Sequence, residues 1–173
     1  MDSTLESQRL ENLYKYEILD SPPDGSFDEI TSLASKIFNV PIALISLVDS
    51  DRIWFKSYHG IDVDQISKDP GLCSSAILTD DVYIIKEAKI DPRTLSNPLV
   101  VGVLGLQFYA GAPLKTKEGY NLGTFCIIDQ KPRTLTVDQS IMLRQLARIV
   151  MNQLELRLQS RVLLKEFKEK NKN

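Results

Sequence analysis

The strongest nucleophiles in this sequence are two cysteines, Cys73 and Cys126. A thiol reacts as its thiolate, and two thiols join as a disulfide where the compartment is oxidising. The two cysteines lie far apart in the chain, and apolar residues surround each of them. This setting favours free, buried thiols in a reducing compartment over a disulfide framework.

The other residues that commonly carry catalysis or bind ions are few or wrongly spaced. His59 is the only histidine, which excludes a histidine-based catalytic triad and a histidine-rich metal site. Gly102 and Gly105 do not join a strand to a helix, as a phosphate-binding loop requires. Several turn aspartates lack the spacing and the glycine of a calcium loop: Asp49, Asp51, Asp62, Asp64 and Asp69. We therefore predict no catalytic residue and no metal site, with His59 at a strand end and the turn carboxylates solvated.

The composition is that of an ordinary globular protein. Of the 173 residues, 43% are apolar and 25% are charged, which suffices for a core and excludes a disordered chain. The net charge of −2 and the lack of a basic stripe argue against nucleic-acid binding. No apolar run is long enough to cross a membrane, and residues 1–6 lack the features of a signal peptide. We expect a cytoplasmic chain whose residues make no membrane contact.

Two apolar strands form the centre of the predicted fold. Residues 108–114 and 121–129 are nearly free of charge, and the polar connector between them contains Gly119, as a hairpin turn does. Strands without a polar face are usually covered on both sides. We therefore predict helices behind this hairpin and a different cover in front of it.

Apolar spacing and breaker residues indicate the remaining elements of the domain. Ser26 and Glu29 have the spacing of a capping box at the start of a helix. A long irregular crossover usually covers a site or is mobile, and residues 61–72 and 86–105 are predicted to be irregular. The predicted strands are 42–48, 52–59 and 82–85, and the predicted helices are 5–16, 26–38 and a short turn at 73–78.

The last predicted element is a helix capped by Thr136 that runs for about 30 residues, well beyond the ~12 typical of a domain helix. Its first half can pack on the sheet. Its second half carries a thin apolar seam among charged residues, with no part of the domain left to pack on, and needs a partner helix. The predicted dimer residues are Val150, Leu154, Leu158 and Val162.

Several segments carry a family resemblance: residues 16–23 with 27–28, 40–49, 54–57, 108–114, 122–129 and 131–133. Together they resemble a GAF domain, the small sensory module of bacterial and eukaryotic signalling proteins. The branch they resemble is found at the front of bacterial histidine kinases, diguanylate cyclases and related phosphodiesterases. The resemblance covers nearly the whole chain and keeps the order of the segments.

The resemblance implies an α+β fold with a GAF/PAS-like central antiparallel sheet of five or six strands. Terminal helices would pack on one face, and loops and short helices would roof a ligand-sized pocket on the other. The implied divisions are an N-terminal helix and proline turn at 1–25, the GAF domain at 26–150 and a signalling or coiled-coil helix at 151–173. Because side chains alternate along strands, half of any aromatic set must face the helices. The pocket candidates are Trp54, Phe55, Cys73, Ser75, Tyr83, Asn97, Phe108, Tyr109, Phe125 and Cys126.

The resemblance leaves the ligand and cofactor unknown. Bilin-binding relatives attach the tetrapyrrole to a cysteine with a histidine close by, whereas this chain has Cys73-Ser74-Ser75, so a bilin is disfavoured. Haem is disfavoured because the only histidine, His59, belongs at a strand end. The Asn-Lys, Phe, Asp-Glu signature of cyclic-nucleotide GAF domains is not traceable in the chain.

The implied function is that of a non-catalytic sensor in a two-component or related signalling protein. It would bind a small molecule or mediate dimerisation, and would relay a signal through its terminal helices to an output domain. The parent would be a homodimeric histidine kinase, cyclase or phosphodiesterase. Two alternatives stay open: a thiol enzyme of the free methionine sulfoxide reductase type, built on Cys73 and Cys126, and a purely structural dimerisation module.

Overall fold

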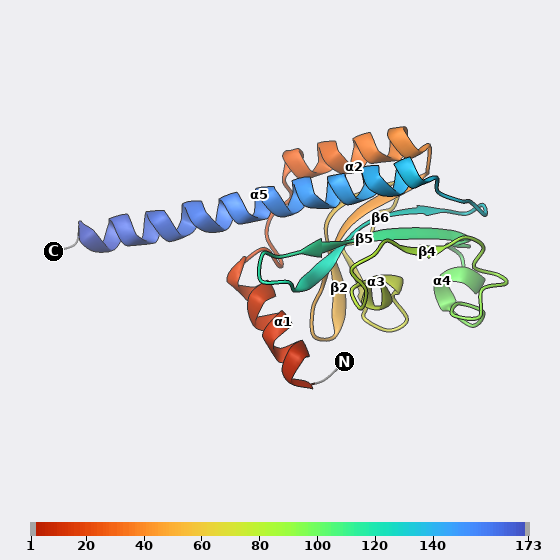
Figure 1. Cartoon of the computed structure of the whole chain (residues 1–173), viewed down its shortest axis with the longest axis horizontal. Helices are drawn as coiled ribbons and strands as arrows, with labels where there is room; N and C mark the ends of the chain where they lie inside the picture. The colour runs from red at the N-terminus through yellow and green to blue at the C-terminus, as the bar shows by residue number, and fades with distance from the viewer. Residues whose placement is uncertain (1–2, 172–173) are drawn as a thin grey trace.

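In the computed structural model, which describes residues 3–171, six strands form one antiparallel sheet in the order β3-β2-β1-β6-β5-β4 (Figure 1). The predicted α+β fold with a central antiparallel sheet is confirmed. The strands are β1 Ile42–Val48, β2 Arg52–His59, β3 Gln65–Ser67, β4 Tyr83–Ile85, β5 Phe108–Lys115 and β6 Asn121–Asp129. The helices are α1 Ser3–Lys15, α2 Gly25–Phe38, α3 Leu72–Ala76, α4 Pro98–Val101 and α5 Val137–Lys170.

The two faces of the sheet carry separate hydrophobic cores, because side chains alternate along each strand. On one face, Ala43, Ile45 and Leu47 of β1 pack under α2 and α5, which lie side by side (Figure 1). On the other face, Ile42 and Leu44 pack under α3, α4 and the irregular segments. We call these the helix-side core and the loop-side core. Both covers predicted from the uncharged strands are therefore present.

Side-chain caps set where the two long helices of the sheet cover begin. At α5, Gln139 N–H donates to Thr136 Oγ1 at 3.1 Å, and Thr136 N–H donates to Gln139 Oε1 at 2.9 Å, which completes a capping box. At α2, the predicted Ser26–Glu29 box is wrong. Asp24 is the N-cap, and its carboxylate accepts from Ser26 N–H at 3.0 Å. The negative charge of this carboxylate is also stabilised by the positive end of the helix dipole.

An edge strand lies inside the segment 61–72 that was predicted to be irregular. This strand, β3, pairs with the start of β2, Ile66 opposite Ile53. It has three residues, of which only Ile66 is apolar, and so few residues give no alternating signal in the sequence.

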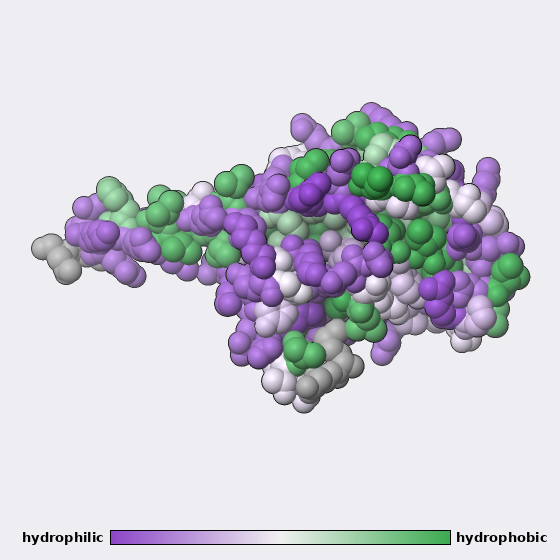
Figure 2. Space-filling model, in the orientation of Figure 1, coloured by the Kyte–Doolittle hydropathy of each residue, from purple (hydrophilic) through white to green (hydrophobic). Residues whose placement is uncertain are grey.

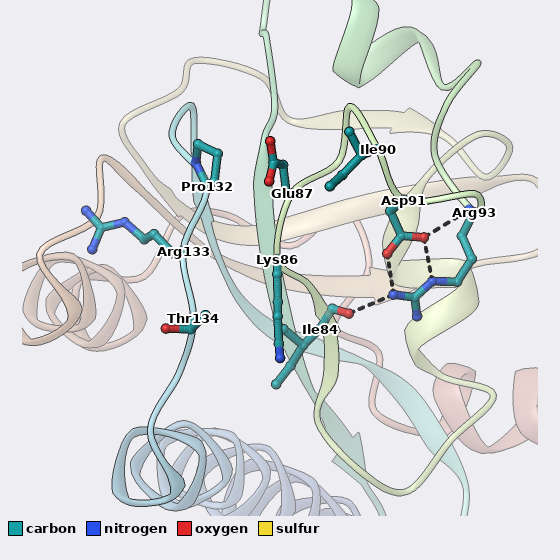
Figure 3. A pocket seen from close by; sticks show the side chains of 9 residues that line it. All are labelled: Ile84, Lys86, Glu87, Ile90, Asp91, Arg93, Pro132, Arg133 and Thr134. Carbon is teal, nitrogen blue, oxygen red and sulfur yellow. Dashed lines mark hydrogen bonds and ion pairs between the residues drawn. The ribbon is translucent and has the colours of Figure 1, made fainter.

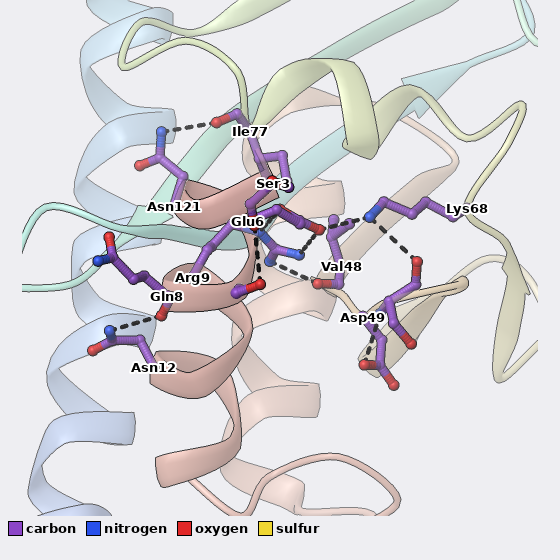
Figure 4. A network of polar contacts seen from close by, with 12 residues as sticks. Ser3, Glu6, Gln8, Arg9, Asn12, Val48, Asp49, Lys68, Ile77 and Asn121 are labelled. Atoms are coloured by element: carbon purple, nitrogen blue, oxygen red, sulfur yellow. Dashed lines mark hydrogen bonds and ion pairs between the residues drawn. The ribbon is translucent and has the colours of Figure 1, made fainter. Parts of the chain in front are cut away.

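Helix α1 is held across one end of the sheet by an ionic network (Figure 4). Arg9 is only 3% exposed, and it donates to the carboxylate of Glu6 at 2.8 Å and to the carbonyl of Val48 at 2.7 Å. Lys68 donates to the same carboxylate at 2.8 Å. The hydrogen bond from Arg9, together with that from Lys68, lowers the pKa of Glu6 to about 2. The network joins α1 to the end of β1 and to the segment after β3.

Helix α5 is 34 residues long, and its second half projects beyond the sheet (Figure 1). Val150 and Leu154 were predicted at a dimer seam, but they are 0% and 2% exposed because they pack in the helix-side core. Leu158 packs at the margin of that core, and Val162 is exposed. The predicted seam is therefore wrong for Val150 and Leu154, which face the chain's own sheet.

Candidate functional site

An apolar cavity of about 210 Å³ lies on the loop-covered face of the sheet, and we call it the loop-side cavity. Strands β1, β2, β5 and β6 form its floor, while α3, the segment around β3 and the connection from α4 to β5 form its walls and roof. Within the described part of the chain, none of its lining side chains is charged. The lining residues are Ile42, Leu44, Phe55, Ile61, Val63, Ile66, Leu72, Cys73, Leu99, Leu104, Leu106, Tyr109 and Ile128.

The pairing register of the strands determines which of their side chains point into the cavity. In the pairing of β1 with β6, Ile42 lies opposite Ile128 and Leu44 lies opposite Cys126. Directly paired residues of an antiparallel sheet point to the same face, so all four belong to the loop-side core. The apolar floor thus follows from every second residue of two strands.

One amide side chain joins the two irregular segments of the roof. Asn97 caps α4 by accepting from Leu99 N–H at 2.9 Å, and its amide donates to the carbonyl of Pro70 at 2.8 Å. Asn97 was a predicted pocket residue. Its position is in the roof, where it holds residues near 70 and 99 together rather than lining the cavity.

A buried cluster of uncharged polar side chains adjoins the cavity. The Tyr109 hydroxyl donates to Cys73 Sγ at 3.3 Å and lies 3.3 Å from Thr124 Oγ1. The Ser46 and Thr124 hydroxyls are 2.9 Å apart. Cys73 and Cys126, both free thiols, also interact with each other. The cluster satisfies its polar groups internally, as buried polar groups require.

The two thiols of this cluster differ in acidity. A hydrogen bond from the Cys126 thiol, with others from neighbouring hydroxyls, lowers the pKa of Cys73. Burial raises the pKa of Cys126 and also raises that of Tyr109 well above its ordinary value. Of the two thiols, Cys73 is the one that faces the cavity.

Four further pocket candidates lie in the loop-side core. Phe55, Cys73 and Tyr109 line the cavity, and Cys126 is buried beside Cys73. Tyr83 is half-buried, with its ring edge-on to that of Tyr109 at a centroid distance of 6.2 Å. Binding of a ligand by these residues stays a prediction.

Three aromatic candidates do not reach the cavity. Trp54, Phe108 and Phe125 lie in the helix-side core, so their predicted place in the pocket is wrong. Each is adjacent in sequence to a strand residue that points to the loop side. Because side chains alternate along a strand, each of the three points to the opposite face. Ser75 is half-buried on α3 and does not line the cavity either.

The sequence did not single out most of the aliphatic lining. Ile42, Leu44 and Ile128 were recognised as strand residues and Leu104 as part of the crossover, whereas Leu106 lies just outside the predicted segments. A strand that is apolar on both faces carries no alternation from which the face can be read. One signal was available in the sequence. Cys126 and Ile128 are two residues apart on one strand and therefore point to the same face, and Leu44 lies opposite Cys126 on the neighbouring strand.

A larger surface hollow of about 730 Å³ beside β4 is lined by charged side chains, of which Arg93 is already paired (Figure 3). Arg93 is folded onto Asp91, with an ion pair of 2.6 Å, and also donates to the carbonyl of Ile84 at 3.0 Å. Arg133 pairs with Asp129 outside this hollow. The arginines are thus engaged within the protein, and the loop-side cavity remains the candidate site.

Residues 3–171 contain no group of three or more histidine, cysteine, aspartate or glutamate side chains placed to hold a metal ion. Among the same residues, no helix combines the length and the apolar character needed to span a membrane.

A six-stranded antiparallel sheet with helices on one face and a roofed cavity on the other is the architecture of a GAF domain. The family model described as GAF domain matches residues 22–156, and the chain belongs to this family. It is 42% identical over 135 residues to a cyclic di-GMP phosphodiesterase of Pseudomonas aeruginosa, a match that covers 78% of this chain. The chain spans only 23% of the length of that relative.

Solved structures with the same fold include an enzyme and a GAF domain of a larger protein. The free methionine-R-sulfoxide reductase of Neisseria meningitidis matches with a TM-score of 0.65 and 15% identity, over 92% of this chain and 95% of that one. The GAF domain of an Acinetobacter phosphoenolpyruvate-protein phosphotransferase matches with a TM-score of 0.63 and 15% identity, over 90% and 95%. At such identity the likeness shows the fold alone.

Proposed function

We propose that this GAF domain is a non-catalytic sensor that binds a small molecule in the loop-side cavity. Binding would change the position of α5 through a chain of contacts. One observation carries the proposal: a cavity on one face of the sheet is joined, through a continuous set of contacts, to a projecting helix on the other face. A ligand that fits one arrangement of these contacts better than another shifts the population of helix positions.

The first part of the relay is a β-bulge in β2. Ile45 of β1 pairs with Ser57 and Ser46 pairs with Phe55, so Lys56 is the extra residue of the bulge. Phe55 lines the cavity, whereas the ammonium of Lys56 donates to Ser21 Oγ at 2.9 Å and to the carbonyl of Pro22 at 2.7 Å. Consecutive residues of β2 thus contact the cavity and the connection between α1 and α2.

The second part of the relay is that connection, residues 16–24, which we call the linker. Arg157 of α5 forms an ion pair with Asp24, and Arg161 donates to the carbonyl of Tyr16. The hydroxyl of Tyr16 donates to the carboxylate of Glu155 at 2.6 Å. A displacement of the Lys56 ammonium therefore has a path to α5 through the linker, without any change in the sheet order.

One exposed side of α5, which continues into the projecting second half of the helix, supports a homodimer. Ile149, Leu156 and Leu163 are between 46% and 64% exposed and are spaced by seven residues. Ser160 and Phe167 each follow a residue of this repeat by four positions, which is the second seam position of a heptad. Both are exposed on the same side of the helix. A seven-residue apolar repeat favours pairing with a second copy, which presents the identical seam in register. Apolar side chains along this projection are visible in Figure 2.

We also propose a cytoplasmic signalling parent without nucleic-acid or membrane contact by this domain. The identity to the Pseudomonas enzyme supports an output domain of the cyclic di-GMP phosphodiesterase kind. Native mass spectrometry of the full protein from its own source tests the sensing proposal. We expect a bound small molecule that is released on unfolding. A population free of bound mass from cells grown under several conditions would favour the purely structural role.

One observation favours a second candidate function, a thiol enzyme. Cys73 faces the cavity and Cys126 lies beside it, on a fold shared with sulfoxide reductases. Turnover of free methionine sulfoxide with a thiol reductant separates the two candidates. We expect no activity above that of the Cys73→Ser variant, whereas loss of a measurable activity in that variant would establish the enzyme.

A further inference from the structure

The lining of the loop-side cavity restricts the chemistry of its ligand. Apart from Cys73 and Tyr109, its side chains are aliphatic or, at Phe55, phenyl. The hydroxyl of Tyr109 is already hydrogen-bonded to Cys73 and close to Thr124. A ligand in the cavity therefore meets hydrocarbon and one sulfur, while the polar groups nearby are bonded to each other.

A charged ligand is unfavourable in such a cavity. A phosphate or carboxylate that leaves water needs a cation or several N–H donors as replacement, and without them burial costs roughly several kcal/mol. Within the described part of the chain, the cavity lining contains no lysine, arginine or histidine. This argues against nucleotides, including cyclic ones, as occupants.

The size of the cavity sets a second limit. Its volume of about 210 Å³ lies below the ~300–1,000 Å³ of pockets for drug-sized ligands. An engineered apolar cavity of about 150 Å³ in another protein stays dry and binds benzene. The loop-side cavity is thus large enough for one or two rings and too small for a tetrapyrrole.

We propose that the loop-side cavity binds a small, uncharged, apolar molecule the size of one or two fused rings or of a branched hydrocarbon of similar bulk. The proposal rests on the proposed sensing function and names its ligand class. Burial of the ligand's apolar surface supplies the affinity, and the shape of the lining supplies the selectivity.

Adjacent residues of the roof provide a matched pair of test variants. Leu104 lines the cavity and is half-buried, whereas its neighbour Val103 is 106% exposed. Leu104→Trp should place an indole in the cavity, and Val103→Trp adds the same side chain outside it. Leu99→Phe, at another half-buried lining position, serves as a second filling variant if Leu104→Trp folds poorly.

The experiment is an NMR titration of the isotope-labelled protein with benzene, indole, cyclic GMP and cyclic di-GMP. We expect saturable shifts at cavity residues with benzene and indole, binding weakened at least about tenfold in Leu104→Trp, and a change of no more than about twofold in Val103→Trp. Absence of saturable shifts with both apolar probes overturns the inference, as does a filling variant that binds normally.

Stronger cavity shifts with either nucleotide also overturn the ligand class, and they leave the sensing function in place. The sensing function fails separately, if an apolar probe saturates the cavity while the resonances of the linker and α5 stay where they were. The two failures are therefore distinguishable in one data set.

Discussion

At the scale of single residues, Glu6 provides the negative charge that pairs with the buried guanidinium of Arg9. Arg9 and Lys68 both donate to it, and its pKa falls from the ordinary 4.5 to about 2. A carboxyl group with a lowered folded-state pKa stabilises the fold fully above its ordinary pKa. That contribution is lost as the pH falls through the folded-state value.

Glu6→Gln should therefore lower the free energy of unfolding at pH 7 by about 2 kcal/mol, because it leaves buried Arg9 without its anion. The difference from the wild type should shrink between pH 4.5 and about 2 as Glu6 itself becomes protonated. Urea unfolding at a series of pH values measures this. Glu11→Gln, at an exposed position of the same helix, is the control and should change little. A Glu6→Gln loss that is equal at pH 7 and pH 2 would contradict the assignment.

The thiols provide a second prediction at this scale. Both cysteines are buried and Cys73 alone faces the cavity, so iodoacetamide should alkylate Cys73 before Cys126. Both should react at least about tenfold more slowly in the native protein than after unfolding, because a packed thiol is shielded. Peptide mass spectrometry at timed intervals reads the two rates. Native Cys73 reacting as fast as the unfolded thiol would favour the enzyme alternative.

At the scale of elements, the contact between β1 and β6 depends on a missing side chain. A Cβ at Gly123 would lie 1.8 Å from the carbonyl oxygen of Ser46 and 2.8 Å from Cα of Leu47. Neither backbone atom can move without separating the two central strands.

Gly123→Ala should therefore cost about 3 kcal/mol of stability, at the upper end for overpacking in a core. Gly25→Ala is the matched control, since a Cβ there meets nothing within 4 Å, and it should change stability by less than about 1 kcal/mol. Thermal or urea unfolding of both variants decides the matter. Equal effects of the two substitutions would show that the close approach of β1 and β6 is wrong.

Most elements were predictable because each carries a local signal. The uncharged strands 108–114 and 121–129, the proline turn before α2 and the cap at Thr136 all signal their structure within a few residues. The pairing of one strand with another has no such local signal in the sequence. The face of Trp54, Phe108 and Phe125 depends on register and on the bulge at Lys56, and neither has a local signature.

The candidate site was predictable in part for the same reason. Phe55, Cys73 and Tyr109 stood out by residue type, whereas Ile42, Leu44 and Ile128 look like any core residue until their strands are paired. The linker contacts of Arg157 and Arg161 were also missed, because they join residues separated by well over a hundred positions.

At the scale of the whole molecule, dimerisation through the seam of Ile149, Leu156 and Leu163 is testable with charge-matched variants. Leu156→Glu with Leu163→Glu adds two negative charges to the seam and should convert a dimer to a monomer. Lys168→Glu changes the net charge by the same amount at an exposed position off the seam and should leave the dimer intact. Light scattering coupled to size exclusion gives the masses. A wild-type monomer at all concentrations would contradict the proposal.

We propose that the loop-side cavity and α5 are coupled through Lys56 and the linker. Hydrogen–deuterium exchange of the protein with and without saturating indole tests this coupling. We expect slower exchange around the cavity and altered exchange in residues 16–24 and 154–165. In Lys56→Ala the cavity protection should persist while the distant change is lost. Protection confined to the cavity in the wild type, with exchange in the linker and α5 unchanged, would contradict the claim.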